Sequence, residues 1–355
     1  MSLTIRPAGP ADRADWDAFV AARPEGDILQ AWAWGDVMRS VGEPPERLLA
    51  TDEQGRVRGV AQALVRRTTA GRSVVYVPHG PLWEREAEDA GALLPALIDA
   101  LARNARRTGG IVVKVDPRAR ADGAGGDAAA VGDALRAAGL RPARHDLQAR
   151  LTRLLDVAPD EEARIGAWSA GTRNLWRRAL REGTIVDLHR DADPAAMAAF
   201  AALQAGAAAR GGFRTHGPSF HLALATALAP AGGWYLALAR HEAQPIAAMA
   251  VARTGDRAFY LYGAADRAAP PHAYGSYAAM GTMLGALAED GVRTLDLWGV
   301  ADPDDPDADP TWRGFSAFKR RFGGRELRHP GTFDLVVSGA WYALRDLRER
   351  LAAPR

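Results

Sequence analysis

The chain contains no cysteine, which excludes disulfide bonds, thiolate metal sites and cysteine nucleophiles. Its sequence has no apolar run approaching the roughly 18 residues that a membrane-spanning helix needs. Residues 1–10 lack the apolar core of a secretion signal. From these absences we expect a cytoplasmic protein.

Several motifs that mark common enzyme classes are also missing. There is no Walker motif, no dinucleotide fingerprint after a strand, no histidine pair at metal spacing and no Gly-x-Ser-x-Gly elbow. The loop by which coenzyme-A acetyltransferases hold a pyrophosphate, Arg/Gln-x-x-Gly-x-Gly/Ala, is missing as well. The sequence therefore predicts neither a bound metal nor a cofactor.

Lysine is scarce. Of 45 basic residues only Lys114 and Lys319 are lysines, and the formal net charge is +2. A GC-rich genome explains the excess of arginine, and chance survival is the alternative explanation for the two lysines, more so for Lys114 than for Lys319. A lysine kept in such a chain is nevertheless of interest, because arginine does not replace a compact ammonium. The small positive charge permits a nucleic-acid partner without requiring one.

The order of the predicted elements suggests a duplication. A chain of 355 residues suits two domains. Each half is predicted to contain an antiparallel meander, a helix and a further strand. In the first half these are strands 47–50, 57–67 and 74–77, helix 91–107 and strand 111–115. In the second half they are strands 234–240, 244–254 and 257–263, helix 276–290 and strand 294–298. Residues 160–181 are predicted to form one long helix.

From this order we expect one domain over residues 1–146 and another over 147–330. The C-terminal helix, within 331–355, is expected to pack back on the first domain.

Six segments resemble, in family order, the motifs of the Fem family (FemABX-type) of peptidoglycan aminoacyltransferases. They are Ile28-Leu-Gln-Ala-Trp-Ala-Trp-Gly35, Tyr76-Val-Pro-His-Gly-Pro81, Lys114-Val-Asp-Pro117, Tyr260-Leu-Tyr-Gly-Ala264, Asp296-Leu-Trp-Gly-Val300 and Phe318-Lys-Arg-Arg-Phe-Gly-Gly324. The resemblance spans residues 28–324. It implies an α/β fold of two tandem acetyltransferase-like (GNAT) domains, with mixed, mainly antiparallel sheets flanked by helices. No sustained heptad pattern is present, which predicts an armless, FemX-like member without a helical hairpin arm.

The resemblance also implies an activity. The family moves an amino acid from aminoacyl-tRNA to the side-chain amine of a lysine or diaminopimelate in a stem peptide. The implied partners are an aminoacyl-tRNA and a UDP-linked or lipid-linked muramyl peptide, with the enzyme at the inner membrane surface in the second case. Neither the amino acid nor the form of the acceptor follows from the sequence.

Two residues match catalytic positions of the family. Lys319 matches a lysine near the transferred carbonyl, where a fixed cation stabilises the oxyanion formed when an amine attacks an ester. A phosphate or tRNA contact, or a surface lysine in a basic run, are the alternatives. Asp116 matches the candidate general base, although an aspartate before a proline at a strand end is commonly a turn former. A structural or orienting role is favoured for Asp116.

A further set of residues is expected to bind the acceptor. Tyr260 and Tyr262 alternate with their neighbours on a strand, so both are predicted to face one side. An ordinary aromatic core stripe is the alternative. The family has a lysine after Trp-Gly and a second-domain Arg-x-x-x-Tyr pattern, but this chain departs from both. Either Arg39 and Arg214 replace them, because arginine binds phosphate well, or the acceptor is not a UDP-linked precursor. The substrate-binding candidates are Trp34, Arg39, Arg214, His216, Phe220, Tyr260, Tyr262 and Phe318.

The tRNA-binding candidates are all arginines. Arg173, Arg177 and Arg181 are spaced four residues apart, so on a helix they share a face that suits an RNA backbone or, equally, solvent. Arg320 and Arg321 follow Lys319 directly.

Two other functions remain open at this stage. One is an enzyme that uses acyl-coenzyme A, or that forms a peptide bond from charged tRNA in a natural-product pathway. The other is a non-catalytic module that binds cell-wall precursor or tRNA.

Overall fold

A computed structural model describes residues 3–68, 71–120, 127–212, 215–270, 273–304 and 310–352. The chain folds into two compact units. Unit 1 comprises Met1–Arg150 and Arg328–Arg355, and unit 2 comprises Leu151–Leu327. The segment that follows unit 2 therefore returns to the unit in which the chain begins.

Unit 1 is built on a sheet with the strand order β1-β2-β3-β4-β6-β15-β7. A short strand, β5, pairs with β3. The strands are β1 (Thr4–Pro7), β2 (Pro45–Thr51), β3 (Val57–Arg67), β4 (Ser73–Val77), β5 (Leu82–Trp83), β6 (Gly110–Val115), β7 (Arg141–Pro142) and β15 (Phe333–Val336).

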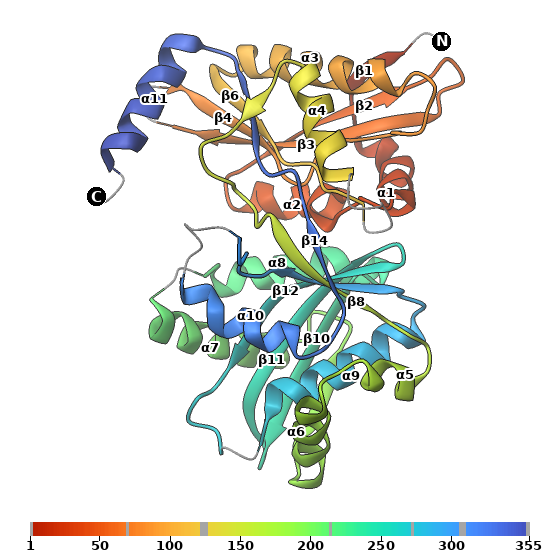
Figure 1. Ribbon diagram of the computed structural model, residues 1–355, viewed down its shortest axis with the longest axis vertical. Helices are drawn as coiled ribbons and strands as arrows, with labels where there is room; N and C mark the ends of the chain where they lie inside the picture. The colour runs from red at the N-terminus through yellow and green to blue at the C-terminus, as the bar shows by residue number, and fades with distance from the viewer. Residues whose placement is uncertain are drawn as a thin grey trace. The chain divides into compact units, whose positions relative to one another are not determined.

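Helices cover both faces of this sheet (Figure 1). On one face α3 (Ala90–Arg107) and α4 (Asp127–Ala137) complete a core that includes Leu97, Val113 and Leu135. On the other, α1 (Arg13–Ala22) and α2 (Trp32–Ser40) bury Trp16 and Trp32, and α11 (Gly339–Ala352) lies against β6. The short 3₁₀ turns are η1 (Pro10–Asp12) and η2 (Ile28–Gln30).

Unit 2 has a seven-stranded sheet in the order β14-β8-β13-β12-β11-β10-β9. Its strands are β8 (Leu151–Asp156), β9 (Ile185–His189), β10 (Trp234–His241), β11 (Gln244–Thr254), β12 (Arg257–Ala265), β13 (Thr294–Gly299) and β14 (Arg325–Arg328). Its helices and turns are α5 (Glu161–Gly166), α6 (Ala170–Arg181), α7 (Pro194–Gly211), α8 (Pro218–Leu228), η4 (Ala229–Ala231), α9 (Gly275–Glu289), η5 (Pro310–Trp312) and α10 (Arg313–Arg320).

The two units share one plan. In unit 1 the antiparallel strands β2, β3 and β4 are followed by α3, and then by β6, which pairs with β4 in parallel. In unit 2 the antiparallel strands β10, β11 and β12 are followed by α9, and then by β13, which pairs with β12 in parallel. The predicted duplication of a meander, a helix and a further strand is therefore confirmed.

One predicted helix is wrong. Residues 160–181 form two helices, α5 and α6, rather than one. The break has a local cause, since the Ser169 side chain accepts a hydrogen bond from the backbone N–H of Thr172 and so starts a new helix. None of the helices in the described part of the chain combines the length and apolar character that crossing a bilayer requires.

Candidate active site

The parallel strand pair of unit 2 opens partway along its length. In the described residues the pairing of β12 with β13 runs from Arg257 and Thr294 only to Phe259 and Asp296. In unit 1 the equivalent strands β4 and β6 stay paired over the whole of β4. Beyond Phe259 the pairing between the two strands of unit 2 ends, and residues of both strands past this point line a pocket.

A distortion of β13 accompanies this opening. Between the paired residues of β13 and β8, two residues of β13, Leu297 and Trp298, lie opposite one residue of β8. The β13–β8 ladder therefore contains a bulge. Trp298 has a φ of 64°, in the left-handed region that large residues rarely adopt. The buried Asp296 carboxylate holds this turn, because it accepts hydrogen bonds from the Trp298 N–H at 2.7 Å and from the Thr152 hydroxyl. Such backbone strain is concentrated at functional sites in proteins.

Lys319 reaches into this opening from α10. Its Nζ donates a hydrogen bond of 2.6 Å to the Gly299 carbonyl and lies 4.8 Å from the ring centre of Phe315. The residue is only 8% exposed. Burial lowers the pKa of Lys319 to about 8, partly opposed by the negative charge of Asp296. Lys319 is thus an ammonium at neutral pH, in a setting where the charged form is costly.

Lys319 lines a cavity of about 520 Å³. Its wall combines aromatic rings, two arginines and small residues through which backbone groups are accessible. The lining residues are Ala207, Arg210, Gly211, Tyr260, Leu261, Gly263, Ala264, Ala265, Arg267, Trp298, Gly299, Trp312, Phe315 and Lys319. We call this cavity the Lys319 pocket.

The two tyrosines of β12 do not share a side, so that prediction is wrong. Val251 pairs with Tyr260 and Ala250 with Tyr262, which leaves Leu261 as an extra residue in a bulge. Tyr260 lines the Lys319 pocket, and its hydroxyl lies only 1.6 Å from where a Cβ on Gly263 would be. Tyr262 instead packs edge-on against the ring of His221, at 4.7 Å between ring centres. A bulge cannot be read from an alternating pattern, which is why the prediction failed.

Three other acceptor-binding candidates lie away from this pocket. The ring of His216 stacks on Phe220 at 3.9 Å between centres, and Phe220 is buried. Phe318 packs against Phe322 and Tyr277, on the side of α10 that faces the core. Phe315, four residues before Lys319 and hence on the same side of the helix, lines the pocket instead.

The remaining acceptor-binding candidates belong to unit 1 or lie outside the described residues. Trp34 is buried within α2, and Arg39 is exposed in the last turn of the same helix. Arg214 lies outside the described residues. Met38, at the position where the family has a lysine, is buried.

Asp116, in unit 1, connects the ends of two strands. It accepts hydrogen bonds from the Tyr76 hydroxyl at 2.8 Å and from the His79 backbone N–H at 2.6 Å. The side chain is buried, and burial raises the pKa of Asp116 to about 6. Both of its carboxylate oxygens are therefore already engaged by the protein, which supports the structural role.

We expect Asp116→Asn to lower stability by about 1–3 kcal/mol, because an amide offers one acceptor oxygen where two donors are now satisfied. Urea unfolding would measure this. Tyr76→Phe is the matched variant, since it removes one of the same hydrogen bonds and leaves the carboxylate. A general base would behave differently: Asp116→Asn would abolish transfer by the folded protein, together with the activity limb near pH 6, while Tyr76→Phe would not.

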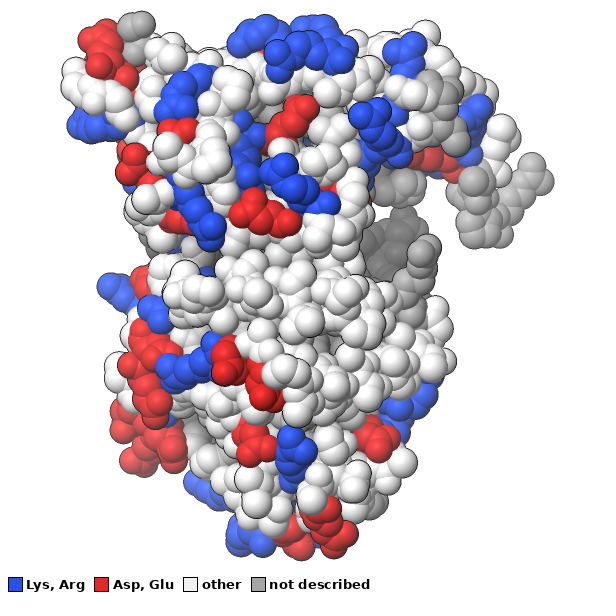
Figure 2. Space-filling view, turned by 180° about the vertical axis from the view of Figure 1, so that it is seen from behind, with Lys and Arg blue, Asp and Glu red and all other residues white. Residues whose placement is uncertain are grey.

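The arginines expected to bind tRNA differ in their exposure and in whether their side chains already bond to the protein. Arg173 donates to the carbonyls of Gly166 and Trp168 at the start of α6, whereas Arg177 and Arg181 are exposed. Arg320 bonds to Glu326 and to the Ala301 carbonyl, and Arg321 is exposed and reaches the Tyr277 hydroxyl. On the face drawn in Figure 2, basic and acidic residues are interspersed on both units. Charge alone therefore does not mark an RNA surface on that face.

The depressed pKa of Lys319 makes stability depend on pH. Between about pH 8 and 10.5 the unfolded lysine keeps its proton while the folded one has lost it, so the unfolded state binds more protons and stability rises with pH. Relative to Lys319→Met, the wild type should gain on the order of 3 kcal/mol across this window. Urea titrations of both proteins at several pH values measure the difference. Parallel curves for the two proteins would contradict the depressed pKa.

Comparisons with known proteins place this geometry in context. Residues 169–320 match the family described as Acetyltransferase (GNAT) domain. The Lipid II:glycine glycyltransferase of Staphylococcus saprophyticus is 28% identical over 238 residues, which are 65% of this chain and 55% of the relative. Its namesake from Staphylococcus aureus is 27% identical over 212 residues, 58% of this chain and 48% of the relative. The chain thus spans about half the length of the curated relatives it matches.

Solved structures confirm the predicted fold. The crystal structure of FemX superposes with a TM-score of 0.83 at 20% identity, over 97% of this chain and 99% of that one. A tandem GNAT protein from the clavulanic acid biosynthesis pathway gives 0.55 at 15% identity, over 95% of this chain and 99% of that one. The fold is therefore a tandem pair of acetyltransferase-like domains, each with a mixed sheet flanked by helices.

Several residues of the Lys319 pocket were not predicted from the sequence. Trp298 and Phe315 were within or beside the quoted motifs, so a signal existed for them. Arg210, Arg267 and Trp312 come from other segments, and only the fold brings them to Lys319.

Proposed function

The chain belongs to the Fem family, and from this premise we propose that it is an aminoacyltransferase that uses aminoacyl-tRNA as donor and the stem peptide of a peptidoglycan precursor as acceptor. The observation that carries the proposal is the buried ammonium of Lys319 at the opening between β12 and β13. A cation in that position suits a reaction that develops negative charge on a carbonyl oxygen.

The proposed reaction is the attack of an amine on an ester. The side-chain amine of the acceptor forms a bond to the ester carbonyl carbon of the charged tRNA, and the carbonyl oxygen becomes an oxyanion. The ammonium of Lys319 stabilises this oxyanion. The bond to the ribose oxygen then breaks, the proton lost by the amine ends on that hydroxyl, and the products are an amide and uncharged tRNA. The ester is already activated, so positioning supplies much of the rate.

The lining of the Lys319 pocket suits the end of a tRNA. Tyr260, Trp298 and Trp312 offer aromatic faces on which a base stacks. Arg210 and Arg267 add positive charge for a phosphate. These contacts, with the exposed Arg177, Arg181 and Arg321, form the proposed tRNA-binding set, whereas Arg173 and Arg320 already bond to their own chain.

We propose that the acceptor is lipid-linked rather than UDP-linked. The position where the family has a lysine for the nucleotide diphosphate holds the buried Met38, which cannot bind phosphate. Both staphylococcal relatives are named Lipid II:glycine glycyltransferase, which agrees with this choice. The reaction would then take place at the cytoplasmic membrane surface. The absence of a helical arm stays a prediction.

Incubation with a pool of charged tRNAs and each acceptor in turn, read by mass spectrometry, tests the proposal. We expect the lipid-linked muramyl peptide to gain the mass of one amino acid residue, and the UDP-linked form to react poorly. A thiol-release assay with acetyl-coenzyme A is the parallel control. Release of thiol without amino acid transfer would favour a coenzyme-A enzyme, and binding of substrates without either reaction would favour a non-catalytic module.

A further inference from the structure

The C-terminal helix α11 is amphipathic, but its faces are arranged opposite to those of an ordinary surface helix. A surface helix normally buries its apolar stripe and exposes its charges. In α11 the leucines point away from unit 1, while most of the charged residues turn toward it. Leu344, Leu347 and Leu351 are 39%, 52% and 78% exposed.

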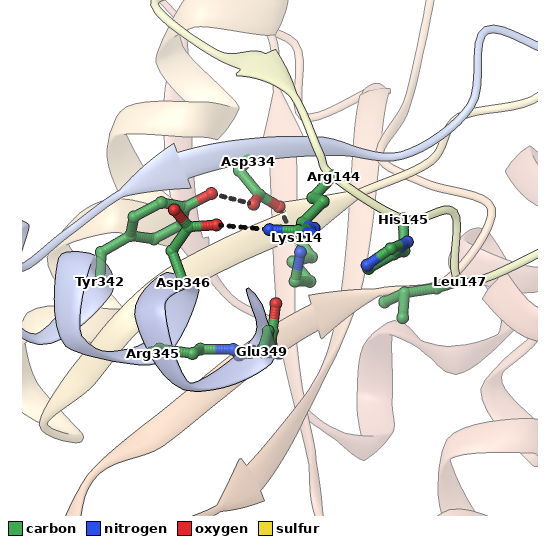
Figure 3. A pocket seen from close by; sticks show the side chains of 9 residues that line it. All are labelled: Lys114, Arg144, His145, Leu147, Asp334, Tyr342, Arg345, Asp346 and Glu349. Atoms are coloured by element: carbon green, nitrogen blue, oxygen red, sulfur yellow. Dashed lines mark hydrogen bonds and ion pairs between the residues drawn. The ribbon is translucent and has the colours of Figure 1, made fainter. Parts of the chain in front are cut away.

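The inner face of α11 is fixed to unit 1 by polar contacts (Figure 3). The Tyr342 hydroxyl donates to Asp334 at 2.7 Å, and the Lys114 ammonium pairs with the same carboxylate at 2.6 Å. Asp346 lies 3.8 Å from Arg144, and Glu349 accepts from Arg345 at 2.7 Å. One ion pair therefore lies in the sheet, where it accepts the Tyr342 contact, and the others lie along the helix or join it to Arg144.

Two aromatic residues at the start of the helix add to this attachment. Trp341 and Tyr342 pack against a small core of Val74, Ile111 and Val112. The guanidinium of Arg72 lies over the Trp341 ring, and that of Arg141 over the Tyr342 ring. The helix is thus held in one orientation, and the outward direction of its leucines is a property of the fold.

The outer face forms one continuous stripe. Leu344, Leu347 and Leu351 are three and four residues apart, so they lie in line on a helix. Arg348 and Arg350 are exposed on either side of them, and Arg350 pairs with Asp346 at 2.7 Å. An apolar stripe bordered by basic side chains is typical of helices that lie in the interface of an anionic bilayer.

Charge and area favour a bilayer over a second copy of the chain. The two acidic residues of α11, Asp346 and Glu349, are already paired with arginines, and Arg72, Arg141 and Arg144 surround the inner face. Three leucines offer on the order of 300 Å² per copy, so a leucine-to-leucine contact falls well below the roughly 1,200 Å² of a stable interface.

We propose that the outer face of α11 binds an anionic lipid bilayer, with Leu344, Leu347 and Leu351 in the headgroup region and Arg348 against lipid phosphates. The contact would bring the enzyme to its acceptor, and this role rests on the proposed function, because a lipid-linked acceptor is confined to a membrane. The binding itself does not depend on catalysis.

Co-sedimentation of the full chain with vesicles tests the binding. We expect binding to vesicles of phosphatidylglycerol mixed with phosphatidylcholine, and much weaker binding to phosphatidylcholine alone. Leu347→Asp combined with Leu351→Asp should reduce binding to the anionic vesicles on the order of tenfold or more. Arg348→Ser should reduce it about fivefold.

Ile185→Asp combined with Leu222→Asp is the matched control, because Ile185 and Leu222 are exposed apolar residues of unit 2, at 66% and 43%, and the pair adds the same two carboxylates. It should bind vesicles like the wild type. Circular dichroism of each variant checks that the fold is retained, which we expect because the changed side chains face outward. Equal loss with the control variant, or no binding by the wild type, overturns the proposal. So does a dimer in light scattering that the leucine substitutions dissociate, since a second copy then covers the stripe.

Transfer assays separate this inference from the proposed function. The leucine variant should lose transfer to a lipid-linked acceptor in vesicles, yet transfer at the wild-type rate to a detergent-solubilised acceptor. Vesicle binding without transfer to any acceptor would leave the helix inference standing and overturn the proposed function. If the leucine variant transferred to the acceptor in vesicles at the wild-type rate, the proposed role of the helix would be wrong.

Discussion

Replacing Lys319 by methionine should reduce kcat for amino acid transfer by about 10²–10³, because the oxyanion then loses its one buried cation in the Lys319 pocket. Methionine is close to lysine in size, and the position is 8% exposed, so the pocket should stay filled. The KM for charged tRNA should change little, since the cation acts on charge that develops during the reaction. Single-turnover transfer with one purified aminoacyl-tRNA measures both quantities.

Arg325→Met is the control for this prediction. Arg325 is a nearby cation that pairs with Asp156 at the surface and does not line the pocket. Its loss should leave kcat within a few-fold of the wild type. If Lys319→Met retained full kcat and only raised the KM for charged tRNA, the lysine would serve binding alone and the proposed mechanism would be wrong.

Replacing Gly324 by alanine should destabilise the protein by about 2–4 kcal/mol. Gly324 has a φ of 78°, and a Cβ there would lie 2.0 Å from the Leu154 carbonyl oxygen, which is backbone and cannot move aside cheaply. The adjacent Gly323 meets the Ala167 carbonyl in the same way, at 2.3 Å. The two glycines therefore fix the segment that follows α10, and through it the helix that carries Lys319.

Gly291→Ala separates the cost of a positive φ from the cost of a steric clash with the backbone. Gly291 also has a positive φ, 73°, but a Cβ there would meet nothing within 4 Å. Its substitution should therefore cost only the conformational strain, about 1 kcal/mol. Chemical denaturation of both variants gives the comparison. Equal losses would mean that the close approach to Leu154 has no energetic weight.

Much of the fold follows from local pattern. Strand 57–67 and helices near 91–107 and 276–290 have long, regular apolar spacing, and the structure places β3, α3 and α9 there. Short elements escaped prediction. The helix α2 has only nine residues, and its first four are all buried, so its apolar spacing is too short to show a helical period. The strand β15 has only four residues and is defined by its partners β6 and β7.

The quoted motifs turn out to mix structural and chemical residues. Gln30 donates to the carbonyls of Gln62 and Pro78, and a Cβ on Gly80 would lie 2.7 Å from its amide, so these motif residues serve packing. Phe322 is core. In the last motif only Lys319 lines the pocket. The motif sequence alone does not separate packing residues from pocket residues, because both kinds can be restricted to one residue type.

The Lys319 pocket itself could be predicted only in part. Lys319 stood out because lysine is scarce, but several of its aromatic and basic neighbours come from distant segments, such as Arg210 on α7, Tyr260 on β12 and Trp298 on β13. The opening between β12 and β13 depends on two bulges, at Leu261 and near Trp298. Bulges are set by the register between strands, which no single stretch of sequence specifies.

The position of β15 has a consequence for how the protein is made. Because β15 sits between β6 and β7, the first sheet is completed by a strand translated after the whole of unit 2. On the ribosome unit 1 must therefore wait, with the edge of β6 unpaired, while unit 2 emerges and folds. An exposed strand edge of this kind is prone to pair wrongly, so nascent chains stalled before residue 333 should depend on chaperones more than the released protein does.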